Sequence, residues 1–343
     1  MTAAPGPEPA GYTDVHAHAM PRPLLAELAA RGLARLDGLA DGHVLIDPRV
    51  SGVPEGARIP CPAEQFDIPA RLAAMDRAGC ALQAVSLPPF VTAGTTPDTA
   101  FADEIVALGN DALAAYVAQA PGRLRALATL PVGSASAVRE ARRCLDDLAV
   151  AGFAIGTQGG GHDLDAPVNE PLWAFLAERG SFVLVHPNAS PSPARTADYW
   201  MPQLVGYPAE TAIAVSRLVL GGVLERHALR LCLAHGGGCL PALRGRLDLG
   251  WRRKEAARTT PHPPSHYLDR LYYDTAVFDD GLLRHLVDRV GPRRILVGTD
   301  FPFDLCDTTA GDTVRRLGLS DEAARRITHD NAADLLRTPT LQL

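Results

Sequence analysis

The chain has 343 residues, of which 47% are hydrophobic and 21% are charged, as in ordinary globular proteins. Its net charge of -6 and its lack of basic runs with interleaved aromatics argue against a nucleic-acid-binding protein, and no stretch is apolar for long enough to cross a bilayer. Residues 1–11 lack the basic and apolar regions of a secretory signal, and the six scattered cysteines include no CxxC pair, so we expect a cytoplasmic protein with reduced thiols.

Short β-type runs recur along the chain, and each is followed by a longer pattern with helical spacing. Most of these runs are continuously apolar, as in strands that are covered on both faces. The β-type runs are 12–18, 81–87, 124–130, 152–157, 181–187, 229–235, 271–275 and 294–300. The helical patterns lie at 68–78, 99–120, 134–152, 169–180, 209–220, 240–257, 280–290 and 320–336.

Eight strands that alternate with eight helices predict an α/β fold, a closed (β/α)8 TIM barrel forming a single domain over residues 12–337. An open doubly wound sheet is the alternative. Such a sheet usually carries a glycine-rich phosphate loop after its first strand, and neither GxGxxG nor GxxxxGK[ST] occurs here. We expect residues 1–11 to be a disordered lead. We expect residues 33–65, rich in glycine and proline, to form an irregular insertion that covers the catalytic face as a lid.

Polar side chains mark the carboxyl ends of several predicted strands. His16 and His18 end the first strand, and residues two apart on a strand point the same way. His186 ends the fifth strand, His235 the sixth and Asp300 the eighth. A lone histidine would more often be a hydrogen-bonded core residue, but barrel active sites are built at these strand ends. Imidazoles and a carboxylate that converge there predict a site for a divalent metal.

These motifs resemble the amidohydrolase superfamily. The resemblance is greatest to the branch that contains 2-amino-3-carboxymuconate 6-semialdehyde decarboxylase and γ-resorcylate decarboxylase. It is carried by DVHAH, VLVHP, LCLAHGGG and ILVGTDFPF, and most specifically by residues 199–303. The fourth strand, GFAIGTQ, has no lysine of the kind that bridges two metals in binuclear hydrolases. The resemblance therefore implies a mononuclear site.

The resemblance also implies roles for the strand-end residues. It assigns one metal ion, zinc with manganese as the alternative, to His16, His18, His186 and Asp300. It makes His235 the catalytic acid or base beside the metal, and it requires no organic cofactor. A homodimer follows as well, because residues 204–225 and the helix after HGGG form the subunit contact in relatives.

Arginines hold the substrate carboxylates in the aminocarboxymuconate enzymes, one of them reaching in from a neighbouring subunit. By resemblance Arg58 and Arg246 take this role, with a solvated surface charge as the alternative for each. A further expected arginine falls at Lys254, which keeps the charge but loses the two-pronged grip on a carboxylate. This departure weakens the expected carboxylate clamp.

Other departures concern the substrate pocket. Asn188 replaces a tryptophan of the family and predicts a roomier, more polar pocket. Asp304 is an added acid, which we interpret as a salt-bridged surface residue. Trp200 is either pocket wall or interface packing.

The sequence favours a metal-dependent non-oxidative decarboxylase (a carboxy-lyase) acting on an aromatic or muconate-semialdehyde-type carboxylic acid. One alternative is a mononuclear-metal hydrolase or hydratase of a small cyclic or unsaturated acid on the same scaffold. Another is a barrel that has lost catalysis and serves binding or assembly. Metal analysis and the release of carbon dioxide distinguish these readings.

Overall fold

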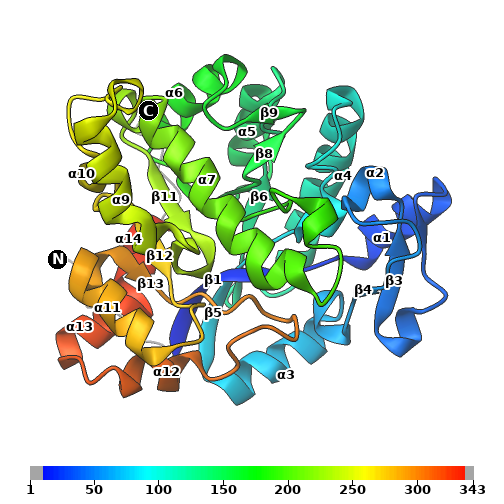
Figure 1. Ribbon diagram of the computed structural model, residues 1–343. Coiled ribbons are helices and arrows are strands. Elements are labelled where there is room, and N and C mark those ends of the chain that lie inside the picture. The colour runs from blue at the N-terminus through cyan, green and yellow to red at the C-terminus, as the bar shows by residue number, and fades with distance from the viewer. Residues whose placement is uncertain (1–10, 337–343) are drawn as a thin grey trace.

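Eight parallel strands form the central sheet of the computed structural model, which describes residues 11–336 (Figure 1). In sheet order they are β1 (Tyr12–His18), β5 (Cys80–Ser86), β6 (Leu124–Thr129), β7 (Gly152–Ile155), β10 (Phe182–Val185), β11 (Arg230–Leu233), β12 (Tyr272–Asp274) and β13 (Ile295–Leu296). The chain after β13 returns to β1, where the amide nitrogen of His18 lies 2.7 Å from the carbonyl oxygen of Phe301. This bond and a parallel bridge from Ala17 to Phe301 close the barrel.

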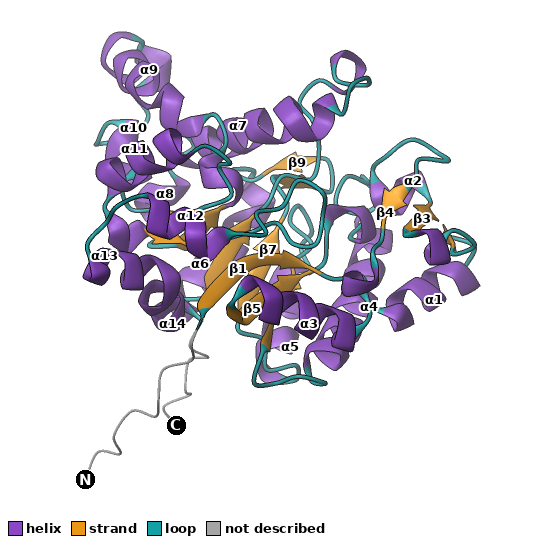
Figure 2. Ribbon diagram, turned by 90° about the horizontal axis from the view of Figure 1, so that it is seen from below, coloured by secondary structure: helices purple, strands orange, loops and turns teal. Residues whose placement is uncertain are grey.

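Helices surround the strands (Figure 2). The long ones are α3 (Ile68–Ala78), α4 (Thr99–Val117), α5 (Ala137–Asp146), α6 (Glu170–Arg179), α7 (Tyr207–Leu220), α9 (Leu240–Arg253) and α11 (Asp280–Val290). Shorter ones are α8 (Val223–Arg226), α10 (Pro264–Leu268), α12 (Ala310–Arg316), α13 (Asp321–Arg325) and α14 (Asn331–Leu335). The predicted (β/α)8 barrel is therefore confirmed. The helix expected at 320–336 is also confirmed: α13, a π-helical turn at Arg326–Asp330 and α14 follow one another without a break.

The strand and helix positions follow from local chemistry. Every residue of β7 and of β10 is buried, as their continuous apolar runs predict for strands covered on both faces. Helix α3 begins where the Asp67 carboxylate accepts a hydrogen bond from the amide of Ala70. It ends at Gly79, whose φ of 67° lies in the left-handed region that glycine adopts without strain. No helix within residues 11–336 has the length and apolar character needed to cross a bilayer.

The segment between β1 and α3 differs from the expected irregular loop. It begins with α1 (Arg22–Ala30), and residues 33–65 contain α2 (Pro48–Ser51) and a three-stranded antiparallel sheet of β2 (Ala34–Arg35), β3 (His43–Ile46) and β4 (Ile59–Pro60). Strands and helices of two to four residues are too short to show a recognisable hydrophobic period. The glycines and prolines were therefore the main signal in this segment, and they suggested an irregular loop. This unit lies beside the barrel, at the right in Figure 1. Apart from Gly11, the predicted lead at 1–11 lies outside the described residues.

Candidate metal centre

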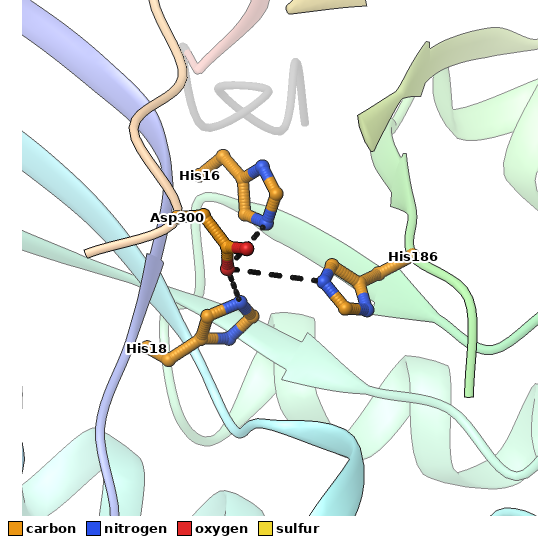
Figure 3. Close-up of side chains that lie close together, drawn as sticks. All are labelled: His16, His18, His186 and Asp300. Carbon is orange, nitrogen blue, oxygen red and sulfur yellow. Dashed lines mark ion pairs between the residues drawn. The ribbon is translucent and has the colours of Figure 1, made fainter. Parts of the chain in front are cut away.

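Four side chains converge at the carboxyl-terminal end of the barrel (Figure 3). His16 and His18 come from β1, His186 follows β10, and Asp300 follows β13. Their potential ligand atoms all lie within 4.8 Å of one another. Oδ1 of Asp300 lies 3.3 Å from Nε2 of His16, 3.0 Å from that of His18 and 4.0 Å from that of His186. Residues far apart in the sequence therefore direct their potential ligand atoms toward one common point.

Within residues 11–336, the polar atoms that face this point have no hydrogen-bond partner. Nε2 of His16, His18 and His186 and Oδ1 of Asp300 are all buried and unsatisfied. Buried polar atoms normally have partners, so four such atoms around a common centre indicate a site suited to a cation. Three imidazole nitrogens and one carboxylate oxygen are a donor set that divalent metals accept. The residues present therefore fit a mononuclear divalent metal site.

The other ring nitrogen of each histidine is anchored. Nδ1 of His16 donates to Oδ2 of Asp274 at 2.6 Å, and Nδ1 of His186 donates to the carbonyl oxygen of the next residue at 2.8 Å. Nδ1 of His18 lies 3.1 Å from the hydroxyl of Ser86. Such contacts fix the ring orientation and the tautomer of metal ligands. They leave each Nε2 turned toward the shared point.

Burial and charge set the protonation of the cluster. Burial lowers the pKa of His18 and brings that of His186 well below its usual range, so both rings are neutral and ready to act as ligands. Burial also opposes a charge on His16, but Asp300 and Asp274 raise its pKa to about 10. Burial would raise the pKa of Asp300, yet the imidazoles around it, His16 above all, hold that pKa well below its usual range. The site therefore favours a positive charge beside Asp300.

His235 lies next to this cluster at the end of β11. Its backbone is left-handed (φ 56°, ψ 40°), which is unusual for a residue with a side chain and costs of order 1–2 kcal/mol. The turn continues through Gly238, where a Cβ would come 2.3 Å from the carbonyl oxygen of Pro208. Nε2 of His235 lies 3.3 Å from Oδ2 of Asp300, and Nδ1 has no hydrogen-bond partner in the part of the chain that the structure describes. His235 thus stands beside the four-residue cluster with a free ring nitrogen.

A cavity of about 360 Å³ opens beside the cluster. His186, His235 and Asp300 form its polar end, and apolar and aromatic side chains form most of its wall. They include Phe90, Trp200, Leu204, Tyr207, Val277, Phe278, Leu282, Phe303 and Leu305, together with Pro60 of β4. Concave, mostly apolar sites with a few convergent polar groups are typical of small-molecule pockets.

The residues expected to hold substrate are distributed differently. Trp200 lines the cavity, with 59% of its surface exposed. Asn188 is buried, and its side chain hydrogen-bonds to Thr157 and to the carbonyl oxygens of Gly94 and Gln158. It is not part of the cavity wall, because these bonds hold it between loops. Its role in substrate binding stays a prediction.

The charged residues discussed as substrate contacts or surface charges are also placed differently from what the sequence suggested. Arg58 and Arg246 are exposed and do not belong to the cavity wall, so their roles also stay predictions. Asp304 does line the cavity. Asp304 is exposed, as expected, but its interpretation as a salt-bridged residue is wrong, since no ion pair to Asp304 is found within residues 11–336.

Two residues of the site were missed at the level of sequence. Asp274 ends β12 and Ser86 ends β5, so both stand at carboxyl ends of barrel strands. The same strand-end rule that selects His186 and Asp300 would have found them. Neither is a candidate ligand, since each contacts the far nitrogen of a histidine.

Comparisons with known proteins agree with this architecture. The family model described as amidohydrolase matches residues 13–338. The 2-amino-3-carboxymuconate-6-semialdehyde decarboxylase of Caenorhabditis elegans is 30% identical over 88% of this chain and 88% of its own length. The enzyme of the same name from Dictyostelium discoideum is 33% identical over 66% of this chain, and the match spans 65% of that enzyme.

Solved structures are similar over nearly the whole chain. The 5-carboxyvanillate decarboxylase LigW of Sphingomonas paucimobilis superimposes with a TM-score of 0.80 at 24% identity, covering 96% of this chain and 99% of the other. A dihydroxybenzoic acid decarboxylase of Polaromonas sp., solved with manganese and 2-nitroresorcinol, gives a TM-score of 0.75 at 25% identity, covering 97% and 100%.

Proposed function

This chain belongs to the amidohydrolase family, and from that premise we propose that it is a metal-dependent, non-oxidative decarboxylase of an aromatic or muconate-semialdehyde-type carboxylic acid. The observation that carries the proposal is the convergence of four unpartnered ligand atoms beside a histidine and an apolar cavity. Relatives and structural neighbours named as decarboxylases support the same reaction.

The reaction assigns a separate task to each part of the site. A divalent metal, when bound by His16, His18, His186 and Asp300, supplies Lewis-acid binding for substrate oxygens. The cavity wall binds the conjugated or aromatic part of the acid and excludes water. His235 acts as the general acid and donates a proton to the carbon that carries the carboxylate. The bond between that carbon and the carbon of the carboxylate group then breaks. Its electron pair stays with the substrate carbon skeleton, and carbon dioxide leaves.

We propose zinc as the metal and no organic cofactor. Three imidazoles with one carboxylate is a common zinc donor set, and His186 and His18 are neutral at physiological pH. Manganese, which the Polaromonas structure contains, is the alternative. Reconstitution of metal-free protein with each ion, followed by metal analysis and assay, distinguishes the two.

We also propose a homodimer. Large apolar side chains are exposed on α7, α9 and the segment before α7, with Tyr199 87% and Trp200 59% exposed. Monomers rarely expose contiguous apolar patches of this kind. Arg58 and Arg246 are exposed, so a role in carboxylate binding requires a neighbouring subunit or movement of residues 33–65 as a lid. Only Pro60 of that segment reaches the cavity in the described structure.

A cytoplasmic location completes the proposal. All six cysteines are free, and four of them are buried. Free thiols are the normal state in a reducing compartment.

The test of the function is a screen of metal-loaded protein against hydroxybenzoates and muconate semialdehydes, with carbon dioxide release and ultraviolet absorbance as readouts. We expect release of one carbon dioxide per substrate consumed. Substrate consumption by ring opening or water addition, without carbon dioxide, would instead identify a hydrolase or hydratase. A protein with no affinity for metal would point to a non-catalytic barrel.

A further inference from the structure

The cavity wall carries an unusual distribution of charge. Among the described residues that form it, there is no lysine and no arginine. Its carboxyl side chains are those of Asp300, which belongs to the metal centre, and of Asp304. The metal centre would attract one carboxylate of a substrate, whereas a second carboxylate on the same substrate meets no lysine or arginine among the described residues of the cavity wall.

Asp304 lines the cavity next to Phe303, a residue packed against the metal centre. The ring of Phe303 lies 5.5 Å from the ring of His18 and 6.0 Å from that of Phe90, measured between centroids. Phe303 thus connects the metal centre to the aromatic wall, and Asp304 follows it directly in the chain. Within residues 11–336 no side chain donates a hydrogen bond to the Asp304 carboxylate. It is free to accept one from a ligand.

We propose that Asp304 is a specificity-determining residue that makes this pocket select acids with a single carboxylate. Its charge repels a second carboxylate on the substrate, and its oxygens accept hydrogen bonds from a hydroxyl or ammonium group. The preferred substrate is then an aromatic monocarboxylic acid with apolar or donor substituents, rather than a dicarboxylic muconate. This inference rests on the proposed function, since it assumes that the metal centre holds the reacting carboxylate.

The expected effect is moderate because Asp304 is exposed. Like charges a few ångströms apart at a partly solvated pocket mouth weaken binding by roughly three- to tenfold. Salt screens such repulsion, so the discrimination decreases as ionic strength rises. A rigid steric exclusion would show no such dependence.

The test uses metal-loaded wild-type protein and the Asp304→Asn variant. The probes are 2-hydroxybenzoates that carry a methyl, hydroxymethyl or carboxylate group at the 4- or the 5-position. Dissociation constants come from calorimetry, and carbon dioxide release is measured in parallel. The control variant is Asp288→Asn, which removes one exposed charge from α11 outside the cavity wall.

In wild type we expect the carboxylate probe to bind at least threefold more weakly than the methyl probe. In Asp304→Asn we expect the ratio of the two dissociation constants, carboxylate probe over methyl probe, to decrease toward one. In Asp288→Asn we expect this ratio to be unchanged. Equal binding of the two probes by wild type, or a ratio that Asp304→Asn leaves intact, overturns the inference. Selective binding without carbon dioxide release supports the selectivity and contradicts the decarboxylase. Failure of every probe to bind overturns both.

Discussion

The carboxylate of Asp274 lies 2.6 Å from Nδ1 of His16, on the side of the imidazole opposite the metal centre. Its second oxygen accepts the amide hydrogens of Gly236 at 2.8 Å and Ala276 at 3.2 Å. Gly236 follows His235 in the left-handed turn. One buried carboxylate therefore orients a metal ligand from β1 and supports the turn that presents the candidate acid.

Asp274→Asn tests this double role. The variant preserves the shape of the side chain but presents an uncharged amide to Nδ1 of His16, so the ring loses the partner that fixes its tautomer. We expect metal affinity to decrease by roughly 10- to 100-fold. Competition with a chromophoric chelator measures this change. Circular dichroism of the metal-free variant serves as the control, and unaltered metal affinity in a folded variant would contradict the assignment.

Metal ligation and proton transfer should separate by mutation. In His235→Ala we expect the metal to be retained and kcat to decrease by roughly 10²- to 10⁴-fold, because only the proton donor is lost. In His186→Ala and Asp300→Ala we expect the metal itself to be lost, because each removes a ligand atom. Metal content by elemental analysis and carbon dioxide release are measured on the same samples. Loss of metal from His235→Ala would show that the roles are assigned wrongly.

Arg71 is a buried cation whose hydrogen bonds all go to uncharged groups. It donates to Gln83 Oε1 at 2.8 Å, to the Tyr116 hydroxyl at 3.0 Å, and to the carbonyl oxygens of Glu64 and His18. The bond to Glu64 joins α3 to the end of the insertion, and the bond to His18 joins it to a metal ligand.

We expect Arg71→Met to destabilise the fold by roughly 3 kcal/mol, since several buried acceptors lose their donor together. Urea unfolding of the metal-free protein measures the free energy. Arg77→Met, an exposed position on the same helix, is the matched control and should change stability by less than about 0.5 kcal/mol. Equal effects of the two substitutions would refute this role of Arg71.

Glu170 gives a prediction on pH. Its hydrogen bonds with Arg226 at 2.8 and 2.9 Å, and then with His227, lower the pKa of this carboxyl from 4.5 to about 2. Because the folded-state pKa is depressed, the stabilisation is complete above pH 4.5 and is lost as the pH decreases from 4.5 toward 2. The side chain is 40% exposed, so solvent screening limits the contribution to about 1 kcal/mol.

Glu170→Gln should therefore be less stable than wild type at pH 7, and the difference should decrease at pH 3. Urea unfolding at both values measures it, with the exposed Glu55→Gln as control. A difference that is constant with pH would show that the carboxylate charge contributes nothing.

The barrel was predictable because its signals are repeated and strong. β7 and β10 are buried on both faces, and their sequences are continuous apolar runs. His16 and His18 are two residues apart at the carboxyl end of β1, so both the alternation of side chains along a strand and the position at a strand end indicate a shared site. Once the closed barrel is inferred, the ends of distant strands must meet, which brings His186 and Asp300 to the same place.

Other features had no comparable signal. β4 has two residues, too few for any period, so the small sheet next to the barrel was not found. The cavity wall consists largely of loop side chains such as Phe90 and Phe278, and loop paths depend on packing rather than on sequence pattern. For the same reason, sequence position alone did not place Asn188 between loops or Arg58 on the surface.

Anomalous X-ray scattering from crystals of the reconstituted protein tests the central claim most directly. Data collected on both sides of the absorption edge of the added ion would locate it independently of any assay. We predict one strong peak per chain, within coordination distance of Nε2 of His16, His18 and His186 and of a carboxylate oxygen of Asp300. A peak elsewhere in the molecule, or none among these four side chains at full metal loading, would contradict the account.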